Sequence, residues 1–294
     1  MYKQKINEYM AGAGENQSSV AKKIGVSPSA LSQYLAGKYP TPMAIEPKIK
    51  EFFAMLEMKG STSLMASRPE FKPTSISDTV INTIAYCHVQ RAMGAIYGDA
   101  GIGKTMSVNK YEEDHTEAIV ISAAFALSKP MSFLKALARK LRTPEVRRQD
   151  DLYIDLVDKL RGSEKILIID EAQHLPHSTL EIIRGLHDDA EVPVVLVGNQ
   201  EVYSKLVGRG EAAFAQLFSR IAIRKNMLTG MIKLTDVERI FTGLGEAETK
   251  FLHDVSRSRW GLRGAVYVYL NAANNGDLSV EGIKKMVKFM GIGA

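Results

Sequence analysis

The chain has 294 residues, enough for more than one domain, and its 45% hydrophobic and 24% charged residues are typical of a globular protein. No apolar run reaches the roughly 18 residues of a membrane-spanning helix, and the first residues lack the apolar segment of a signal peptide, which argues against a membrane-embedded or secreted protein. With a single cysteine, Cys87, no disulfide can form within the chain, so we expect a protein of the reducing cytoplasm.

The net charge of +5 is concentrated at the two ends of the chain. Residues 1–75 carry 10 basic and 6 acidic residues and residues 229–294 carry 9 and 7, whereas residues 76–228 carry 19 and 20. Basic flanks on a nearly neutral middle permit binding of nucleic acid by the flanks. The excess is mild, so charge alone does not assign this function.

Residues 1–60 are predicted to form a small all-α domain around a helix–turn–helix pattern at residues 17–38. Gly25 stands where the first helix must end, and Ser27 and Pro28 suit the N-cap and first position of the second helix. Apolar residues at helical spacing are expected to face inward. They are Val20, Ile24, Val26, Leu31 and Leu35.

The second helix of this pattern presents Ser29, Ser32 and Gln33 outward, and Lys38 follows it. In a helix–turn–helix bound to DNA, the start of the second helix reaches base edges and nearby cations reach phosphates. The pattern resembles the helix-turn-helix domain of phage repressors, which implies DNA binding by these four residues. The alternative is a helical pair that binds protein or has no binding role.

Residues 61–75 are rich in Ser, Thr and Pro and are predicted to be a linker. From residue 76 to 228 helices alternate with short apolar strands, which is typical of a three-layer α/β fold with a parallel sheet covered on both faces. We expect helices at 78–93, 131–141 and 152–161. We expect strands at 94–97, 118–122, 165–171 and 192–199, and a short fifth at 220–223.

The strand at 94–97 leads into a G-x-x-x-x-G-K-T sequence, the phosphate-binding P-loop pattern. Its glycines let several N–H groups point at one phosphate, and the helix that follows adds the positive end of its dipole. In this pattern the Lys reaches the β- and γ-phosphates and the Thr hydroxyl binds Mg²⁺. The predicted nucleotide-binding residues are Gly98, Asp99, Ala100, Gly101, Ile102, Gly103, Lys104 and Thr105.

Asp170 and Glu171 end another buried apolar strand, 66 positions after Lys104. An acid at this place can hold Mg²⁺, directly or through water, and the next acid can take the proton of the attacking water. We therefore predict Asp170 as a metal ligand and Glu171 as the general base.

Three further polar residues are candidates for the same site. Asn199 ends the next strand and could orient the water or contact the γ-phosphate, or be an ordinary turn residue. Arg220, at the helix-to-strand junction where the fifth strand begins, cannot easily reach the phosphate of its own subunit but could reach that of a neighbour. Arg224 is the competing candidate, and a surface ion pair is the alternative for either arginine.

Residues 229–294 are predicted to form a small helical bundle. Thr235 to Glu238 has the pattern of a capping box, and Ser279 can cap the last helix, with Val280, Ile283, Val287 and Met290 on one face. Further helices are expected at 246–257 and 261–270.

In this order, and followed by a helical lid, the motifs resemble those of the AAA+ ATPases over residues 76–294. The resemblance implies ATP and Mg²⁺ as cofactors, Asn199 as sensor 1 and Arg220 as the arginine finger. The segment Trp260-Gly261-Leu262-Arg263 is similar to the sensor-2 motif Gly-x-Arg, which implies nucleotide contact by Arg263. Many members have Gly-Asn-x-Arg there, and this chain lacks the Asn.

Together with the helix–turn–helix pattern, the run Glu171-Ala172-Gln173-His174-Leu175 resembles the transposition ATPases that act on target DNA. This resemblance implies an oligomer that assembles with ATP on double-stranded DNA, as a helical filament, marks a target and stimulates a transposase. Stimulation of ATP hydrolysis by the transposase would clear the filament.

Two other functions stay open. One is another AAA+ role, as a replication initiator or helicase loader. The other is a sequence-specific repressor whose P-loop senses nucleotide, which would bind a palindromic site as a dimer.

Overall fold

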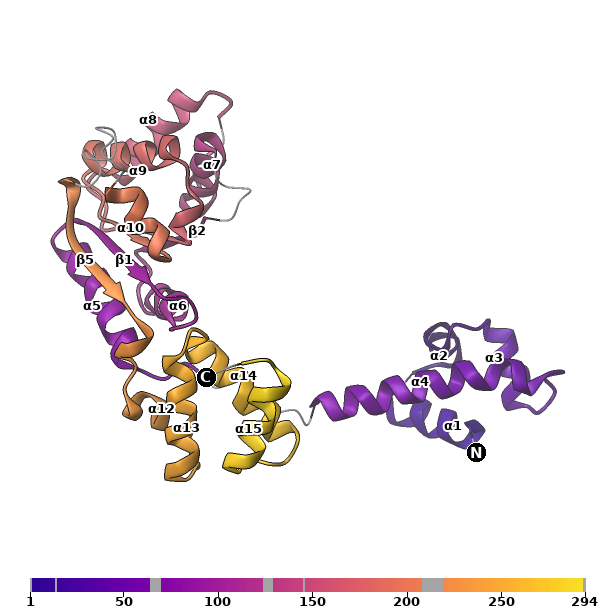
Figure 1. The fold of residues 1–294 in the computed structure, drawn as a ribbon. Coiled ribbons are helices and arrows are strands. Elements are labelled where there is room, and N and C mark those ends of the chain that lie inside the picture. Colours follow the sequence, from indigo (N-terminus) through magenta and orange to yellow (C-terminus); the bar gives the residue numbers. More distant parts are fainter. Residues whose placement is uncertain are drawn as a thin grey trace. The chain divides into compact units, whose positions relative to one another are not determined.

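The computed structural model describes residues 2–13, 15–63, 70–123, 129–144, 146–207 and 219–292. The chain divides into two compact units, Met1–Ala66 and Ser67–Ala294. Among the described residues, none of the helices combines the length and the apolarity that crossing a bilayer requires. Figure 1 shows the elements of each unit.

The first unit is all helical and has a core of its own. It consists of α1 (Tyr2–Ala13), α2 (Gln17–Ile24), α3 (Pro28–Leu35) and α4 (Pro42–Ser63). Gly25 ends α2 with φ of 76°, and Ser27 caps α3 by accepting a hydrogen bond from the Ala30 N–H. The expected inward residues Val20, Ile24 and Leu31 are buried, while Val26 and Leu35 pack against this core.

Ser29, Ser32, Gln33 and Lys38 are exposed. Their contact with DNA stays a prediction.

The second unit is built on a five-stranded parallel sheet in the order β2-β3-β4-β1-β5. The strands are β1 (Met93–Gly98), β2 (Ala118–Ser122), β3 (Ile166–Asp170), β4 (Val194–Val197) and β5 (Ile221–Met227). Because all strands run in one direction, the P-loop after β1 and the acids after β3 emerge at the same edge of the sheet.

Successive side chains of the strands belong alternately to two hydrophobic cores, as a strand periodicity of two requires. Leu167 and Ile169 pack under α7 (Pro130–Leu141), α8 (Gln149–Leu160), α9 (His177–Ala190) and α10 (Gln200–Val207). Ile166 and Ile168 pack in the other core, with α5 (Ser75–Val89), α6 (Lys104–Asp114) and the C-terminal helices. The three-layer α/β prediction is confirmed.

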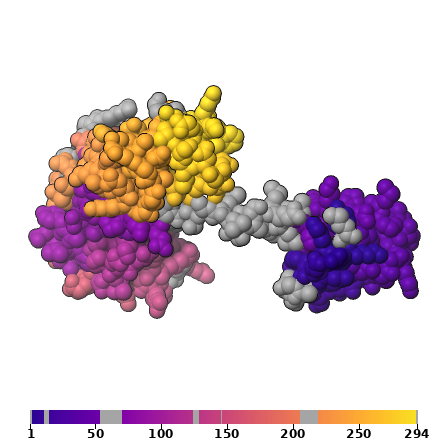
Figure 2. Space-filling model, turned by 90° about the horizontal axis from the view of Figure 1, so that it is seen from below, coloured from indigo at the N-terminus to yellow at the C-terminus, as the bar shows by residue number. Residues whose placement is uncertain are grey.

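The C-terminal helices are α12 (Leu234–Ile240), α13 (Glu246–Arg257), α14 (Gly261–Asn274) and α15 (Val280–Phe289). They share a hydrophobic core with α5 and α6, so this lid packs directly on the sheet domain, as Figure 2 shows for its orange and yellow surface. The buried Asp236 carboxylate accepts hydrogen bonds from the backbone N–H and the hydroxyl of Ser75, which ties α12 to the start of α5.

Several predicted boundaries were wrong. α5 begins at Ser75, because Thr74 is its N-cap, and it ends at Val89. α12 is capped at Lys233 rather than Thr235, with Asp236 accepting the Lys233 N–H. The fifth strand extends to Met227. α4 continues to Ser63, inside the predicted linker, of which residues 64–69 lie outside the described part.

Candidate nucleotide-binding site

The P-loop connects the buried strand β1 to the start of α6. Gly103 is the N-cap of α6 with φ of 102°, and Gly98 and Gly101 also have positive φ, a conformation that costs glycine little. A Cβ at Gly98 would lie 1.9 Å from the Met227 carbonyl oxygen, so β5 also requires glycine there. The first-turn N–H groups of α6 lack intrahelical acceptors, and such groups are suited to bind an anion.

Lys104, the first residue of α6, is 9% exposed. Its Nζ donates to the carbonyl oxygens of Gly98, at 3.1 Å, and of Asp99, at 2.6 Å. Burial lowers the pKa of Lys104, and the carboxylates of Asp170, Glu171 and Asp99 act against this lowering. The ammonium group therefore lies within the loop that would surround the phosphates.

Asp99 accepts the Lys104 hydrogen bond with its backbone carbonyl, whereas its side chain bonds to a different part of the chain. The Asp99 carboxylate accepts the Thr229 N–H at 2.7 Å, and the Asp99 N–H donates to the Met227 carbonyl at 2.9 Å. These bonds fix the loop to the end of β5.

Asp170 is 4% exposed at the end of β3. Its carboxylate accepts a hydrogen bond from the Glu171 N–H at 2.9 Å. Burial raises the pKa of Asp170, while the Thr105 hydroxyl, the Glu171 N–H and Lys104 oppose the rise. The Thr105 hydroxyl and the Asp170 carboxylate line the same pocket and are a donor set that suits Mg²⁺, which keeps several waters and binds few protein ligands.

Glu171 has φ of 55°, an uncommon value for a residue with a side chain. Its carboxylate accepts a hydrogen bond from the Gln173 amide, and the Gln173 Oε1 accepts the Asn199 N–H at 3.2 Å. Gln173 is 6% exposed. In the sequence, Gln173 stands out only as part of the run from Glu171 to Leu175, which predicts no role for its side chain.

Asn199 lines the same pocket and also caps α10, because its Oδ1 accepts the Glu201 N–H at 2.8 Å. The capping bond uses the oxygen of the amide. The amide nitrogen is the group that could donate to a phosphate or a water.

The start of α14 lies directly on the P-loop. The Arg263 N–H donates to the Gly101 carbonyl at 2.9 Å. A Cβ at Gly261, whose φ is 63°, would lie 2.8 Å from the carbonyl oxygens of both Ala100 and Gly101. The lid thus touches the P-loop backbone, and the exposed Arg263 side chain lines the pocket.

A pocket of about 510 Å³ joins these parts, within the usual range for small-molecule sites. It is lined by Lys104, Thr105, Asp170, Glu171 and Asn199, the groups expected around the phosphates. Apolar and aromatic side chains, of the kind that pack on a nucleobase, line it as well. These are Phe71, Ile240, Leu262, Val266 and Tyr267, which the sequence analysis did not single out because they come from three separate segments.

Arg220 lies where the strands begin, whereas the P-loop lies where they end. Its neighbour Ile221 pairs with Met93, the first residue of β1, whereas the P-loop follows Gly98, the last. Five residue steps of strand correspond to roughly 16 Å. Arg220 therefore lies far from the nucleotide site of its own chain.

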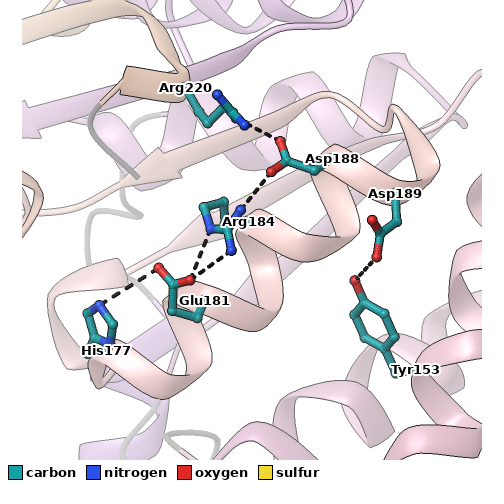
Figure 3. A network of polar contacts seen from close by, with 7 residues as sticks. All are labelled: Tyr153, His177, Glu181, Arg184, Asp188, Asp189 and Arg220. Atoms are coloured by element: carbon teal, nitrogen blue, oxygen red, sulfur yellow. Dashed lines mark hydrogen bonds and ion pairs between the residues drawn. The ribbon is translucent and has the colours of Figure 1, made fainter. Parts of the chain in front are cut away.

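The Arg220 Nε donates to the Asp188 carboxylate at 2.9 Å, and half of its side chain is exposed. Figure 3 shows this pair at one end of a row of charged side chains along α9, in which Arg184 bridges Asp188 and Glu181. Arg224, the competing candidate, is exposed in the middle of β5, beside Ala95.

The predicted residues thus fall into three groups. The P-loop, Asp170, Glu171, Asn199 and Arg263 lie around one pocket. Arg220 and Arg224 lie outside it, and Ser29, Ser32, Gln33 and Lys38 belong to the other unit.

Comparisons with known proteins agree with this geometry. An AAA domain model matches residues 87–206. The Mu-like prophage FluMu DNA transposition protein B of Haemophilus influenzae is 28% identical over 281 residues, which cover 93% of this chain and 96% of that protein. The ATP-dependent target DNA activator B of Escherichia phage Mu is 26% identical over 263 residues, 85% of this chain and 81% of that protein.

Among solved structures, a Walker-type ATPase of Pyrococcus abyssi superposes with a TM-score of 0.50 at 13% identity, over 72% of this chain and 71% of that chain. At this identity the likeness concerns the fold alone. One conclusion follows from the order of the sheet, the P-loop pocket and the similarity to the two B proteins. Over most of its length the chain resembles the Mu-type transposition B proteins, and residues 87–206 match an AAA domain.

Proposed function

We propose that this ATPase assembles on double-stranded DNA when ATP is bound, presents that DNA as a target and activates a transposase. The observation that carries the proposal is the pocket in which Lys104, Asp170 and Glu171 meet beside the lid residue Arg263. The names of the relatives, a DNA transposition protein and an ATP-dependent target DNA activator, supply the biological setting.

In the proposed reaction the P-loop N–H groups and Lys104 bind the β- and γ-phosphates of ATP. The Thr105 hydroxyl and the Asp170 carboxylate would hold Mg²⁺, which would offset the negative charge of the phosphates. Glu171 takes a proton from the water that attacks the γ-phosphorus, and ADP leaves as phosphate forms. The Asn199 amide orients this water, and Arg263 contacts the nucleotide from the lid.

The proposed site is completed by a second copy of the chain. Arg220 is half exposed and lies far from its own P-loop, so it is a group that can contribute positive charge to a neighbour's γ-phosphate. Coupling of the site to a subunit interface would make assembly depend on ATP. Arg224 is the alternative finger.

The first unit is proposed to contact DNA through Ser29, Ser32, Gln33 and Lys38, which are exposed around α3. Contacts of this kind to phosphates would be weakened by salt.

Negative-stain imaging with plasmid DNA tests the proposal. The protein is mixed with DNA and either ADP or a slowly hydrolysed ATP analogue. Filaments that coat the duplex only with the analogue are expected. Discrete particles at one DNA sequence, formed equally with either nucleotide, would contradict the proposal and favour a repressor. In a separate binding experiment, recruitment of a helicase without a response to transposase would favour a helicase loader.

A further inference from the structure

A buried glutamine connects two parts of the nucleotide site that come from different strands. Gln173 lies in the short 3₁₀ helix Ala172–His174 after β3, and Asn199 follows β4. The Gln173 amide nitrogen donates to the Glu171 carboxylate, and its oxygen accepts the Asn199 N–H at 3.2 Å. The orientation of the amide follows from chemistry, because a carboxylate only accepts and a backbone N–H only donates.

The space for this side chain is created by Gly198. A Cβ at Gly198 would lie 2.2 Å from the Gln173 Oε1 and 2.5 Å from the Val202 Cγ2. Gly198 has no positive φ, so its backbone conformation does not require glycine. The close approach of the buried Gln173 amide does.

We propose that Gln173 is a positioning residue, which holds the Glu171 carboxylate and the Asn199 backbone in the fixed relative placement that hydrolysis needs. This inference rests on the proposed role of Glu171 as the general base. One carboxylate oxygen is bound by Gln173, which leaves the other to take the proton of the attacking water. The other bond of Gln173 fixes the start of α10, where Asn199 caps the helix.

The first test replaces Gln173 by residues of similar length. Gln173→Met removes both hydrogen bonds, and Gln173→Glu keeps an acceptor for the Asn199 N–H but removes the donor to Glu171. A misplaced base costs on the order of 10-fold to 100-fold in rate. We expect both variants to lose kcat by this factor, with KM and the affinity for a fluorescent ATP analogue within about twofold of wild type.

The second test uses Gly198→Ala, which must displace Gln173. The change is combined with Val202→Ala in one variant, because Val202 is the other side chain that the new methyl group would meet. Gln173 is then the side chain that has to move. Gly198→Ala should lower kcat as Gln173→Met does, and combining the two should cost no more than either alone. Gln149→Met, at an exposed position at the start of α8, serves as the control.

Glu171→Gln is measured in parallel to separate the two hypotheses. Wild-type turnover in Glu171→Gln would overturn the base assignment itself. Loss of turnover in Glu171→Gln with wild-type kcat in Gln173→Met or Gln173→Glu would overturn only the role of Gln173. Losses from Gly198→Ala and Gln173→Met that multiply, or a loss explained by nucleotide affinity, would also contradict the positioning role.

Discussion

Lys104 illustrates how one residue can serve both the fold and the ligand. Its ammonium group is buried and bonded to two P-loop carbonyls, and burial lowers its pKa while three carboxylates oppose the shift. A cation in such surroundings gains most from an anionic partner, because little water competes with that partner. Binding of the ATP phosphates is therefore expected to depend on the Lys104 side chain.

We predict that Lys104→Ala abolishes stabilisation of the protein by ATP. A ligand at 100 times its Kd stabilises the folded protein by about 2.7 kcal/mol, which corresponds to a rise of several degrees in Tm. Wild type should show this rise in a thermal scan with MgATP, and Lys104→Ala should show none.

The matched control is Lys110→Ala on the same helix. Lys110 is partly exposed and pairs with Asp114 at 2.7 Å, away from the P-loop. It should keep the full response to ATP. An ATP-dependent rise in Tm for Lys104→Ala equal to that of Lys110→Ala would contradict the assignment of Lys104.

At the scale of elements, the contact between α14 and the P-loop determines how the lid meets the nucleotide. Gly261 permits this contact in two ways, by its φ of 63° and by the absence of a Cβ next to the carbonyls of Ala100 and Gly101. A side chain there must move the start of α14 away from the loop. The Arg263 side chain, two residues on, would move with it.

We predict that Gly261→Ala weakens nucleotide binding and slows hydrolysis, in addition to lowering stability. Gly276→Ala is the control, because Gly276 has a φ of 69° but nothing within 4 Å of its Cβ position. An alanine in this conformation costs about 1–2 kcal/mol, so both variants should lose comparable stability from the backbone alone. Titration with a fluorescent ATP analogue and urea unfolding separate the two effects; equal nucleotide affinity in both variants would disprove the lid contact.

The strands show what the sequence could predict about elements. β2 was predicted at its observed bounds, because all of its first four residues are buried and apolar. β5 was predicted too short, because it is an edge strand in which Arg224, Lys225 and Asn226 are exposed, and no apolar run marks its second half.

The site shows the same division between local and long-range information. The P-loop and the pair Asp170 and Glu171 are recognisable because their chemistry lies in consecutive residues. The bridge from Gln173 to Asn199 was not predictable, because it depends on β3 and β4 being neighbours in the sheet and on the space left by Gly198. In the sequence this bridge corresponds to a single polar residue, Gln173. No periodicity in the sequence indicates that this residue is buried.

At the scale of the whole molecule, the proposed role of Arg220 requires a second copy of the chain. The base and the P-loop lie at one edge of the sheet, and Arg220 lies at the other, where Asp188 holds it. The row of charged residues on α9 fixes its direction, as Figure 3 shows. An active site that uses Arg220 must therefore join two chains.

This arrangement predicts complementation between two inactive variants. Arg220→Ala keeps Glu171 but supplies no finger, and Glu171→Gln keeps Arg220 but has no base, so each alone should lose most of its turnover while still binding ATP. In a mixture on DNA, the Glu171→Gln subunit can offer its arginine to the intact Glu171 of its Arg220→Ala neighbour. About a quarter of the sites in a random one-to-one mixture then contain both groups, and ATP turnover should return to that fraction of the wild-type rate.

The control mixture replaces Arg220→Ala by Arg161→Ala, an exposed arginine at the end of α8 that pairs with Asp158. Arg161→Ala should be active by itself, and its mixture with Glu171→Gln should simply scale with the active subunits. If the mixture of Arg220→Ala and Glu171→Gln stays as inactive as its components, Arg220 does not act across the interface, and the same experiment with Arg224→Ala decides whether that residue takes its place. Complementation is the measurement that connects the pocket of one chain to assembly, because no property of a single subunit can produce it.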